Sequence, residues 1–161
     1  RTATAQMTLV WRSSDLSLDL KKQLVKSLIW SIALYGCESW APKEVDIKKL
    51  HALEMWIWRR MLRISWRERK SNDYIRLKVK VPEAKGLVAQ FKERKLRKYG
   101  HWKRRGDSLV LSTIEGEIEG TRCVGRRSTS WIDDVKKWEG GLAAARYNAK
   151  ERSRWPNGAM T

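Results

Sequence analysis

The stretch LKKQLVKSLIWSIALY, residues 20–35, decides the first element of the fold. Its apolar side chains recur at intervals of three or four residues, which places them on one face of an α-helix. The residues that share this spacing are Leu20, Leu24, Leu28, Ile32 and Tyr35. Cap-type residues between Ser13 and Ser17 precede the pattern, and Gly36 offers a natural stop. We therefore predict a helix here, with this apolar stripe as its buried face.

Helical spacing recurs on both sides of this stretch. The first dozen residues are compatible with a shorter helix that turns Met7, Val10 and Trp11 inward. After Pro42, a proline position that helices tolerate near their start, a second long pattern begins. Its apolar members are Ile47, Leu50, Leu53, Ile57, Met61 and Ile64. Because only a short turn joins the two long helices, we expect them to pack antiparallel.

A third long helix is predicted after a shorter one. The cap sequence SND at 71–73 begins a helix that extends to about Val79, and Pro82 ends it. The third long stripe is less regular and consists of Leu87, Val88, Phe91, Leu96, Tyr99 and Trp102. Gly100 lies within it, and glycine costs a helix about 1 kcal/mol relative to alanine. We therefore expect a bend or an end near Gly100.

The composition and the spacing pattern of the sequence change at Gly106. Gly116, Gly120 and Gly125, with the alternation in EGEIEG, indicate turns or a small hairpin. WIDDVKKW then resumes helical spacing, and AAARYNAKERSRW predicts a last helix. The sequence thus predicts a mainly α protein, with a helical bundle over 1–105 followed by a small mixed helical and hairpin lobe over 106–161.

Composition points to a polyanionic partner. The 161 residues include 35 Lys and Arg against 18 Asp and Glu, a formal net charge of +17, with 42% hydrophobic residues. This balance favours a nucleic-acid-binding protein, with an anionic membrane surface as the main rival. The longest apolar run, 28–35, is too short to cross a bilayer. The chain opens RTATAQM, without an initiator Met or a leader, which indicates an internal piece of a longer protein.

The positive charge is concentrated in two runs. Residues 59–70 and 92–105 together contain fourteen basic residues and two acids, or +12 of the net +17. Each run is interleaved with aromatic residues. A solvated helix face is the plain alternative for one run, but two such runs favour a surface that follows a phosphate backbone. The rings of Trp56, Trp58, Trp66, Tyr99 and Trp102 are more often core or groove-wall residues than base-stacking platforms.

Recognisable catalytic and metal-binding motifs are absent. His51, His101, Cys37 and Cys123 are the only His and Cys residues, and no pair has metal-ligand spacing. The sequence therefore predicts no catalytic residue, no metal and no cofactor. Two cysteines also suggest a reducing nuclear or cytoplasmic setting. Trp131-Ile132-Asp133-Asp134 imitates the metal-binding motif of polymerase palms, but helical spacing follows it, so we interpret the acids as first-turn residues of a capped helix.

The order of the motifs carries a resemblance. LKKQLVKSLIWSIALYGCESW is followed by LEMWIWRRMLRISW, RKLRKYGHWKRR, EGEIEGTRCVGRRSTSWIDDVKKW and ERSRW. From about Leu9 to Trp155, the chain is similar to the carboxy-terminal part of reverse transcriptases from non-long-terminal-repeat (LINE-like) retrotransposons. The resemblance implies a helical thumb, with Leu20 to Trp66 as thumb helices, and a carboxy-terminal extension.

The resemblance also implies a role. A thumb of this kind contacts the backbone of a template–primer duplex and is not itself catalytic, so we expect a fragment that binds RNA, RNA–DNA or DNA duplex. The palm and fingers of a parent enzyme, or a ribonucleoprotein assembly, are further expected partners, and a membrane is not. The predicted nucleic-acid-binding residues are Arg59, Arg60, Arg63, Arg67, Arg94, Lys95, Arg97, Lys98, His101, Lys103, Arg104, Arg105, Arg126 and Arg127.

Two departures and one alternative accompany this interpretation. The family commonly has Gly-Arg-Pro where this chain has Gly125-Arg126-Arg127, and the chain lacks the Cys/His zinc knuckle that some relatives carry. Fingers, palm and endonuclease are missing. The alternative function is that of a decayed or domesticated fragment that serves as a structural component of a larger ribonucleoprotein or protein assembly.

Overall fold

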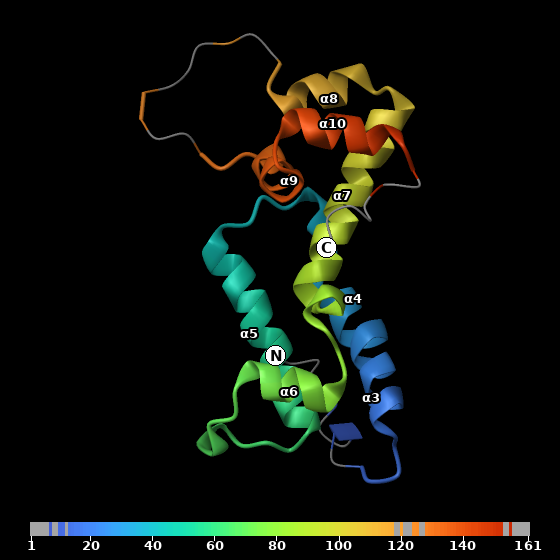
Figure 1. Ribbon diagram of the computed structural model, residues 1–161, viewed down its shortest axis with the longest axis vertical. Coiled ribbons are helices and arrows are strands. Elements are labelled where there is room, and N and C mark those ends of the chain that lie inside the picture. The colour runs from blue at the N-terminus through green and yellow to red at the C-terminus, as the bar shows by residue number, and fades with distance from the viewer. Residues whose placement is uncertain are drawn as a thin grey trace. The chain divides into compact units, whose positions relative to one another are not determined.

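All regular secondary structure in the described part of the chain is helical. The computed structural model describes residues 7, 10–11, 13–117, 120, 124–125, 128–152 and 155 (Figure 1). Every regular element in these ranges is a helix, and none of these residues is in a strand. The mainly α prediction is therefore confirmed. The predicted helix in the first dozen residues lies mostly outside the described residues, although Trp11 is buried as expected.

The chain divides into two compact units. The first consists of Arg1–Tyr35 and Glu44–Gln90, and the second of Gly36–Lys43 and Phe91–Thr161. The predicted boundary at 105/106 is therefore corrected to a division inside the third long helix. The physical reason is that Leu96 and Tyr99 of this helix belong to the hydrophobic core of the second unit.

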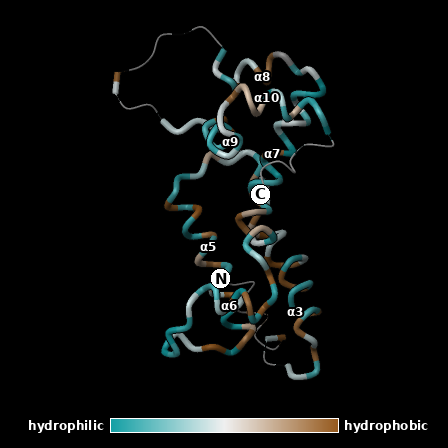
Figure 2. Tube along the Cα trace, in the orientation of Figure 1, coloured by the Kyte–Doolittle hydropathy of each residue, from teal (hydrophilic) through white to brown (hydrophobic). Residues whose placement is uncertain are grey.

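The first helical stretch of unit 1 buries a different face from the predicted one. It consists of α3 (Leu18–Leu24), a π-helical turn (Val25–Trp30) and α4 (Ser31–Ala33), and it begins where the Ser17 hydroxyl accepts a hydrogen bond from the backbone N–H of Leu20. Hydrophobic and hydrophilic residues alternate along it (Figure 2). Its buried apolar residues are Val25, Ile29 and Trp30, followed by Leu34.

The prediction that the stripe from Leu20 to Tyr35 forms the buried face of this helix is wrong. Leu20, Leu28, Ile32 and Tyr35 are exposed. The helix carries two apolar stripes side by side, and the one with Trp30 is buried, where its ring meets that of Trp58. The π-helical turn contains both Ile29 and Trp30, and its wider winding differs from the 3.6-residue period on which the prediction rested.

The second long helix completes the core of unit 1. Helix α5 (Glu44–Met61) runs in the direction opposite to the first stretch, as predicted (Figure 1). The rings of Trp30 and Trp58 meet edge to face with centroids 5.9 Å apart. The indole N–H of Trp58 donates to the buried carboxylate of Glu54 over 3.2 Å, so this polar edge is satisfied inside the core.

The short helix after α5 follows its predicted caps. Helix α6 (Asn72–Val79) begins at Ser71, whose hydroxyl accepts from the backbone N–H of Tyr74, and it buries Ile75 and Val79. It ends at Lys80, whose φ of 56° lies in the left-handed region. A three-residue helical turn at Glu83–Lys85 then leads to α7 (Leu87–Arg105).

Unit 2 packs three short helices against the later part of α7. These are α8 (Ser108–Glu115), α9 (Trp131–Glu139) and α10 (Leu142–Lys150). Their core consists of Leu96, Tyr99, Leu111, Ile132, Val135, Ala145, Ala149 and Trp155. Helix α9 begins with a capping box in which the Asp133 carboxylate accepts from the backbone N–H of Ser130. The capping interpretation of the Asp-Asp motif is thereby confirmed.

The predicted turns or hairpin after Gly106 are corrected in their first part. Residues 108–115 form α8, because Leu111 and Glu115 share one buried helix face. The helix ends at Gly116, whose φ of 79° a residue with a side chain rarely adopts. The remaining hairpin positions, 118–119, 121–123 and 126–127, lie outside the described residues.

Helix α7 does not end at Gly100, because it continues without interruption to Arg105. Glycine is required at this position by close packing. A Cβ at residue 100 would lie 2.4 Å from Nε1 of Trp155, an indole that is itself buried and donates to the carbonyl of Leu96 over 2.7 Å. The absence of a side chain lets Trp155 lie against the helix.

Gly100→Ala should therefore destabilise unit 2. An alanine in an open helix would stabilise it by about 1 kcal/mol, but overpacking against Trp155 should cost about 1–3 kcal/mol more than that gain. Urea unfolding followed by tryptophan fluorescence measures the difference. In a Trp155→Ala background the same substitution should become neutral or stabilising. A destabilisation that persists in that background would contradict the packing explanation.

Candidate nucleic-acid interface

The two basic runs fall in different units. Residues 59–70 belong to unit 1, and residues 92–105 belong to unit 2. Their predicted location on one shared face stays a prediction.

In the second run, Lys95 is a core residue. Its side chain is fully buried, and its ammonium donates to the Asp134 carboxylate over 2.5 Å and to the Trp40 carbonyl over 2.8 Å. The ammonium also lies 4.7 Å from the ring centroid of Trp131 and 5.8 Å from that of Trp138. Burial lowers the pKa of Lys95, although the contact with Asp134 opposes this shift. The prediction that Lys95 binds nucleic acid is corrected, because no phosphate can reach it.

Most of the other cations in this run also have internal partners. Arg97 pairs with Glu93, Lys103 with Glu115 at 3.6 Å and Arg105 with Asp107 at 3.3 Å. Arg104 donates to the carbonyl of Ala149 over 2.8 Å. Lys98 lies over the ring of Trp102 with its ammonium 5.3 Å from the centroid, and His101 is exposed. Four cations of this run, including Lys95, thus pair with carboxylates of unit 2, and the Arg104 guanidinium is bound by a carbonyl.

The Glu115 carboxylate is the anionic centre of unit 2. The Tyr99 hydroxyl donates to it over 2.6 Å, and the Arg146 guanidinium donates to it through two nitrogens. Burial acts to raise the pKa of Glu115, but the bonds from Arg146 and Tyr99 outweigh burial and hold the pKa below its ordinary value. Burial also raises the pKa of the Tyr99 hydroxyl. Tyr99 is thus a core residue, which confirms the core interpretation for this ring.

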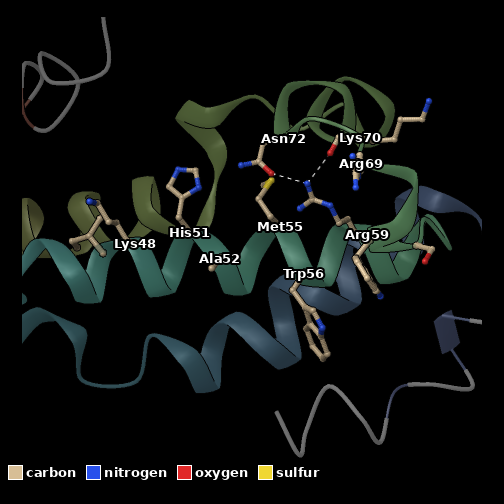
Figure 3. A pocket seen from close by; sticks show the side chains of 12 residues that line it. Lys48, His51, Ala52, Met55, Trp56, Arg59, Arg69, Lys70 and Asn72 are labelled. Atoms are coloured by element: carbon tan, nitrogen blue, oxygen red, sulfur yellow. Dashed lines mark hydrogen bonds between the residues drawn. The ribbon is translucent and has the colours of Figure 1, made fainter.

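Unit 1 contains a cationic cavity of about 730 Å³. Its walls come from α5, from the segment 65–70 and from the start of α6 (Figure 3). Four of the lining residues are Lys or Arg, and none is Asp or Glu. The lining residues are Ile47, Lys48, His51, Ala52, Met55, Trp56, Arg59, Ser65, Trp66, Arg69, Lys70 and Asn72. An unopposed set of cations of this kind attracts an anionic ligand.

Arg59 connects the two walls of this cavity. Its Nη2 atom donates to the carbonyl of Lys70 over 3.1 Å and to Oδ1 of Asn72 over 2.8 Å (Figure 3). These bonds tie the end of α5 to the start of α6. A guanidinium has five N–H donors, so the side chain can still donate to a ligand while it holds the loop.

Trp66 is presented to solvent by a rigid turn. The three-residue helical turn Trp66–Glu68 begins with a capping box, in which Ser65 accepts from the backbone N–H of Arg67 and Glu68 accepts from that of Ser65. The indole is 80% exposed. Trp56 also lines the cavity, but its ring points to the other side of α5 from His51 and Met55 (Figure 3).

Three further predicted cations of unit 1, Arg60, Arg63 and Arg67, do not line this cavity. The Arg60 guanidinium lies over the ring of Trp56 at 4.9 Å, and the Arg67 guanidinium lies over that of Trp66 at 5.9 Å. Arg63 is exposed, with a left-handed φ of 58°. In unit 2, Arg94 is half-buried. Arg126 and Arg127 lie outside the described residues.

Four basic cavity residues were absent from the predicted site: Lys48, His51, Arg69 and Lys70. A signal for two of them was present in the sequence. Lys48, His51, Met55 and Arg59 are three or four residues apart and therefore share one face of α5. Arg69 and Lys70 reach the cavity through loop geometry, since Arg69 has a left-handed φ of 49°.

His51 also contacts two charged groups of unit 1, those of Glu83 and Arg76. Its Nε2 lies 3.2 Å from the Glu83 carboxylate and 3.1 Å from the Arg76 guanidinium. The hydrogen bond with His51 and the charge of Arg76 lower the pKa of Glu83. A second, smaller cavity of about 280 Å³ in unit 1 is lined by Lys22, Lys26, Lys80 and Lys85 with Asp19, which pairs with Lys22.

No protein-family model, curated protein or solved structure matches this chain. Among the described residues, no three His, Cys, Asp or Glu side chains are grouped to hold a metal ion. No helix in the same ranges has both the length and the hydrophobicity that a membrane crossing requires.

Lys95→Met should destabilise unit 2 without weakening nucleic-acid binding. The substitution leaves Asp134 without its buried cation, a change that typically costs about 3 kcal/mol or more. Urea unfolding and oligonucleotide binding, each measured on the full chain, report the two properties. The double variant Lys95→Met with Asp134→Asn should lose less stability than the sum of the single changes. Specific loss of binding with unchanged stability would contradict the core assignment of Lys95.

Proposed function

We propose that this protein is a non-catalytic nucleic-acid-binding module that contacts phosphates through the cavity of unit 1. The observation that supports this most is the lining of that cavity, which contains Lys48, Arg59, Arg69 and Lys70 and no Asp or Glu. Polyanion backbones are bound by such arrays of cations through release of counterions.

The overall charge supports the same proposal. With a net charge of +17, the chain attracts polyanions at long range, and the cavity provides a place where this attraction becomes a contact. Much of the second basic run is balanced inside unit 2, so a smaller number of phosphates is expected to be bound than the sequence alone suggests.

The origin of the module forms part of the proposal. The order of motifs from Leu9 to Trp155 resembles the thumb and carboxy-terminal extension of LINE-like reverse transcriptases. In this view the polymerase chemistry belongs to a palm that this sequence does not include, and the module holds template–primer duplex or structured RNA in the nucleus or cytoplasm.

A structural role in a larger assembly is the second candidate function. It is favoured by the exposed apolar residues on the first helical stretch of unit 1, which include Leu28, Ile32 and Tyr35. Contiguous apolar surface of this kind marks contacts with other macromolecules. The two candidates are compatible if the cavity binds nucleic acid while the apolar stripe faces a protein.

Arg69→Gly should weaken nucleic-acid binding without destabilising the fold. Residue 69 has φ 49°, where an arginine is strained and glycine is not, so loss of binding cannot be attributed to unfolding. If the four cavity cations contact four phosphates, wild-type affinity should fall about 50- to 150-fold between about 50 and 200 mM salt. The variant should reduce the slope of log K against log salt by about 0.7–0.9.

Lys80→Gly is the matched control. It removes one positive charge at another left-handed position of unit 1, with φ 56°, outside the larger cavity. Fluorescence anisotropy with a labelled oligonucleotide compares the two variants. Equal losses would mean that this cavity does not determine binding, and salt-independent binding would contradict the proposed function altogether.

A further inference from the structure

We propose that the cavity of unit 1 takes an unpaired nucleotide of single-stranded nucleic acid, with its base stacked on Trp66 and its phosphates on Arg69 and Lys70. This inference rests on the proposed function and narrows its ligand from duplex to unpaired nucleotides, such as those of structured RNA, because backbone contacts alone would not distinguish a single strand from a duplex.

The exposure of Trp66 is the first support. Large aromatic rings are usually buried, and Trp58 of the same unit is fully buried. Trp66 instead stays 80% exposed on a turn whose backbone is fixed by the Ser65–Glu68 capping box. Local hydrogen bonds thus fix the backbone that carries the ring, so a ligand that covers the ring gains apolar burial without having to order this turn.

The chemistry around the ring is the second support. Trp66 shares the cavity with Arg69 and Lys70, which carry charge, and with Ser65 and Asn72, which offer polar side chains. Met55 contributes an apolar side chain from α5 (Figure 3). A nucleotide presents the same three features, namely an aromatic face, an anionic phosphate and polar base edges. Single-stranded nucleic-acid sites combine aromatic stacking platforms with a cationic groove in this way.

The geometry of the ligand decides between single strand and duplex. Inside a duplex each base is stacked on both of its neighbours, so its faces cannot also lie on an indole. A volume of about 730 Å³ lies within the range of pockets that enclose one small ligand. Arg67 lies over the Trp66 ring at 5.9 Å, and arginine adds cation–π attraction to stacked bases.

The test measures the binding of the full chain to four labelled probes: a short oligouridylate, the matching oligothymidylate, and blunt hairpins of RNA and of DNA whose strands are joined by a non-nucleotide linker. Wild-type protein should bind the single strands more tightly than the hairpins at equal salt. The uridylate and thymidylate arms show whether the site distinguishes RNA from DNA. Trp66→Ala should weaken single-strand binding about 5- to 150-fold, the range typical of one stacked base.

Two control variants separate stacking from general effects. Trp66→Phe should restore much of the single-strand affinity, because it keeps a stacking face. Tyr35→Ala removes an aromatic ring of unit 1 that is 85% exposed but lies outside the cavity lining, and it should leave binding unchanged. Quenching of tryptophan fluorescence by oligouridylate should decrease in Trp66→Ala.

The outcomes distinguish this inference from the proposed function. Equal binding of single strands and hairpins, unaffected by Trp66→Ala but weakened by Arg69→Gly, would overturn the inference and leave backbone binding in the cavity intact. The absence of salt-dependent binding to any of the four probes would overturn both. Loss of hairpin and single-strand binding to the same extent in Trp66→Ala would also overturn the inference, because a structural effect would explain it.

Discussion

The two hydrogen bonds of the Arg59 side chain hold the candidate site together. They join the end of α5 to the Lys70 carbonyl and to the Asn72 side chain at the start of α6. These bonds help to fix residues 65–70 beside the helix face that carries His51 and Met55. Arg59, which the sequence predicts only as a phosphate contact, therefore also forms part of the cavity in which phosphates would bind.

The treatment of charge differs between the two units. In unit 2 the fold supplies partners for its cations, as in the pairs Lys95–Asp134 and Lys103–Glu115. In unit 1 the cavity keeps its cations without a carboxylate in the lining. Because self-repulsion of like charge opposes folding, an uncompensated cluster is expected where a ligand supplies the missing anion. The basic run 92–105, which has the densest charge in the sequence, is thus less available to a ligand than the segment 65–72, which has fewer basic residues.

Much of the fold could be predicted from the sequence, since caps and apolar periods act locally. Ser71 and Ser130 begin helices as their side chains suggest, and α5 follows its apolar spacing. The buried face of the first stretch could not be predicted, because its two apolar stripes are similar and tertiary packing on Trp58 selects the one with Trp30. Helix α8 was not predicted because neighbouring glycines suggested turns. The packing role of Gly100 could not be predicted either, because it depends on Trp155, a residue distant in sequence.

The site was predicted in part for the same reason. Basic residues on α5 were identified, but long-range pairing decides which cations remain available to a ligand, and the sequence does not reveal that Asp134 reaches Lys95. The exposed position of Trp66 likewise depends on a local turn rather than on hydrophobic periodicity.

Ultraviolet cross-linking of the full chain to a bound single-stranded oligonucleotide, followed by mass spectrometry of the linked peptides, tests the central claim most directly. The account predicts adducts in residues 65–72, with Trp66 among the linked positions. Adducts confined to residues 94–105, with none in the segment over α5, would contradict it.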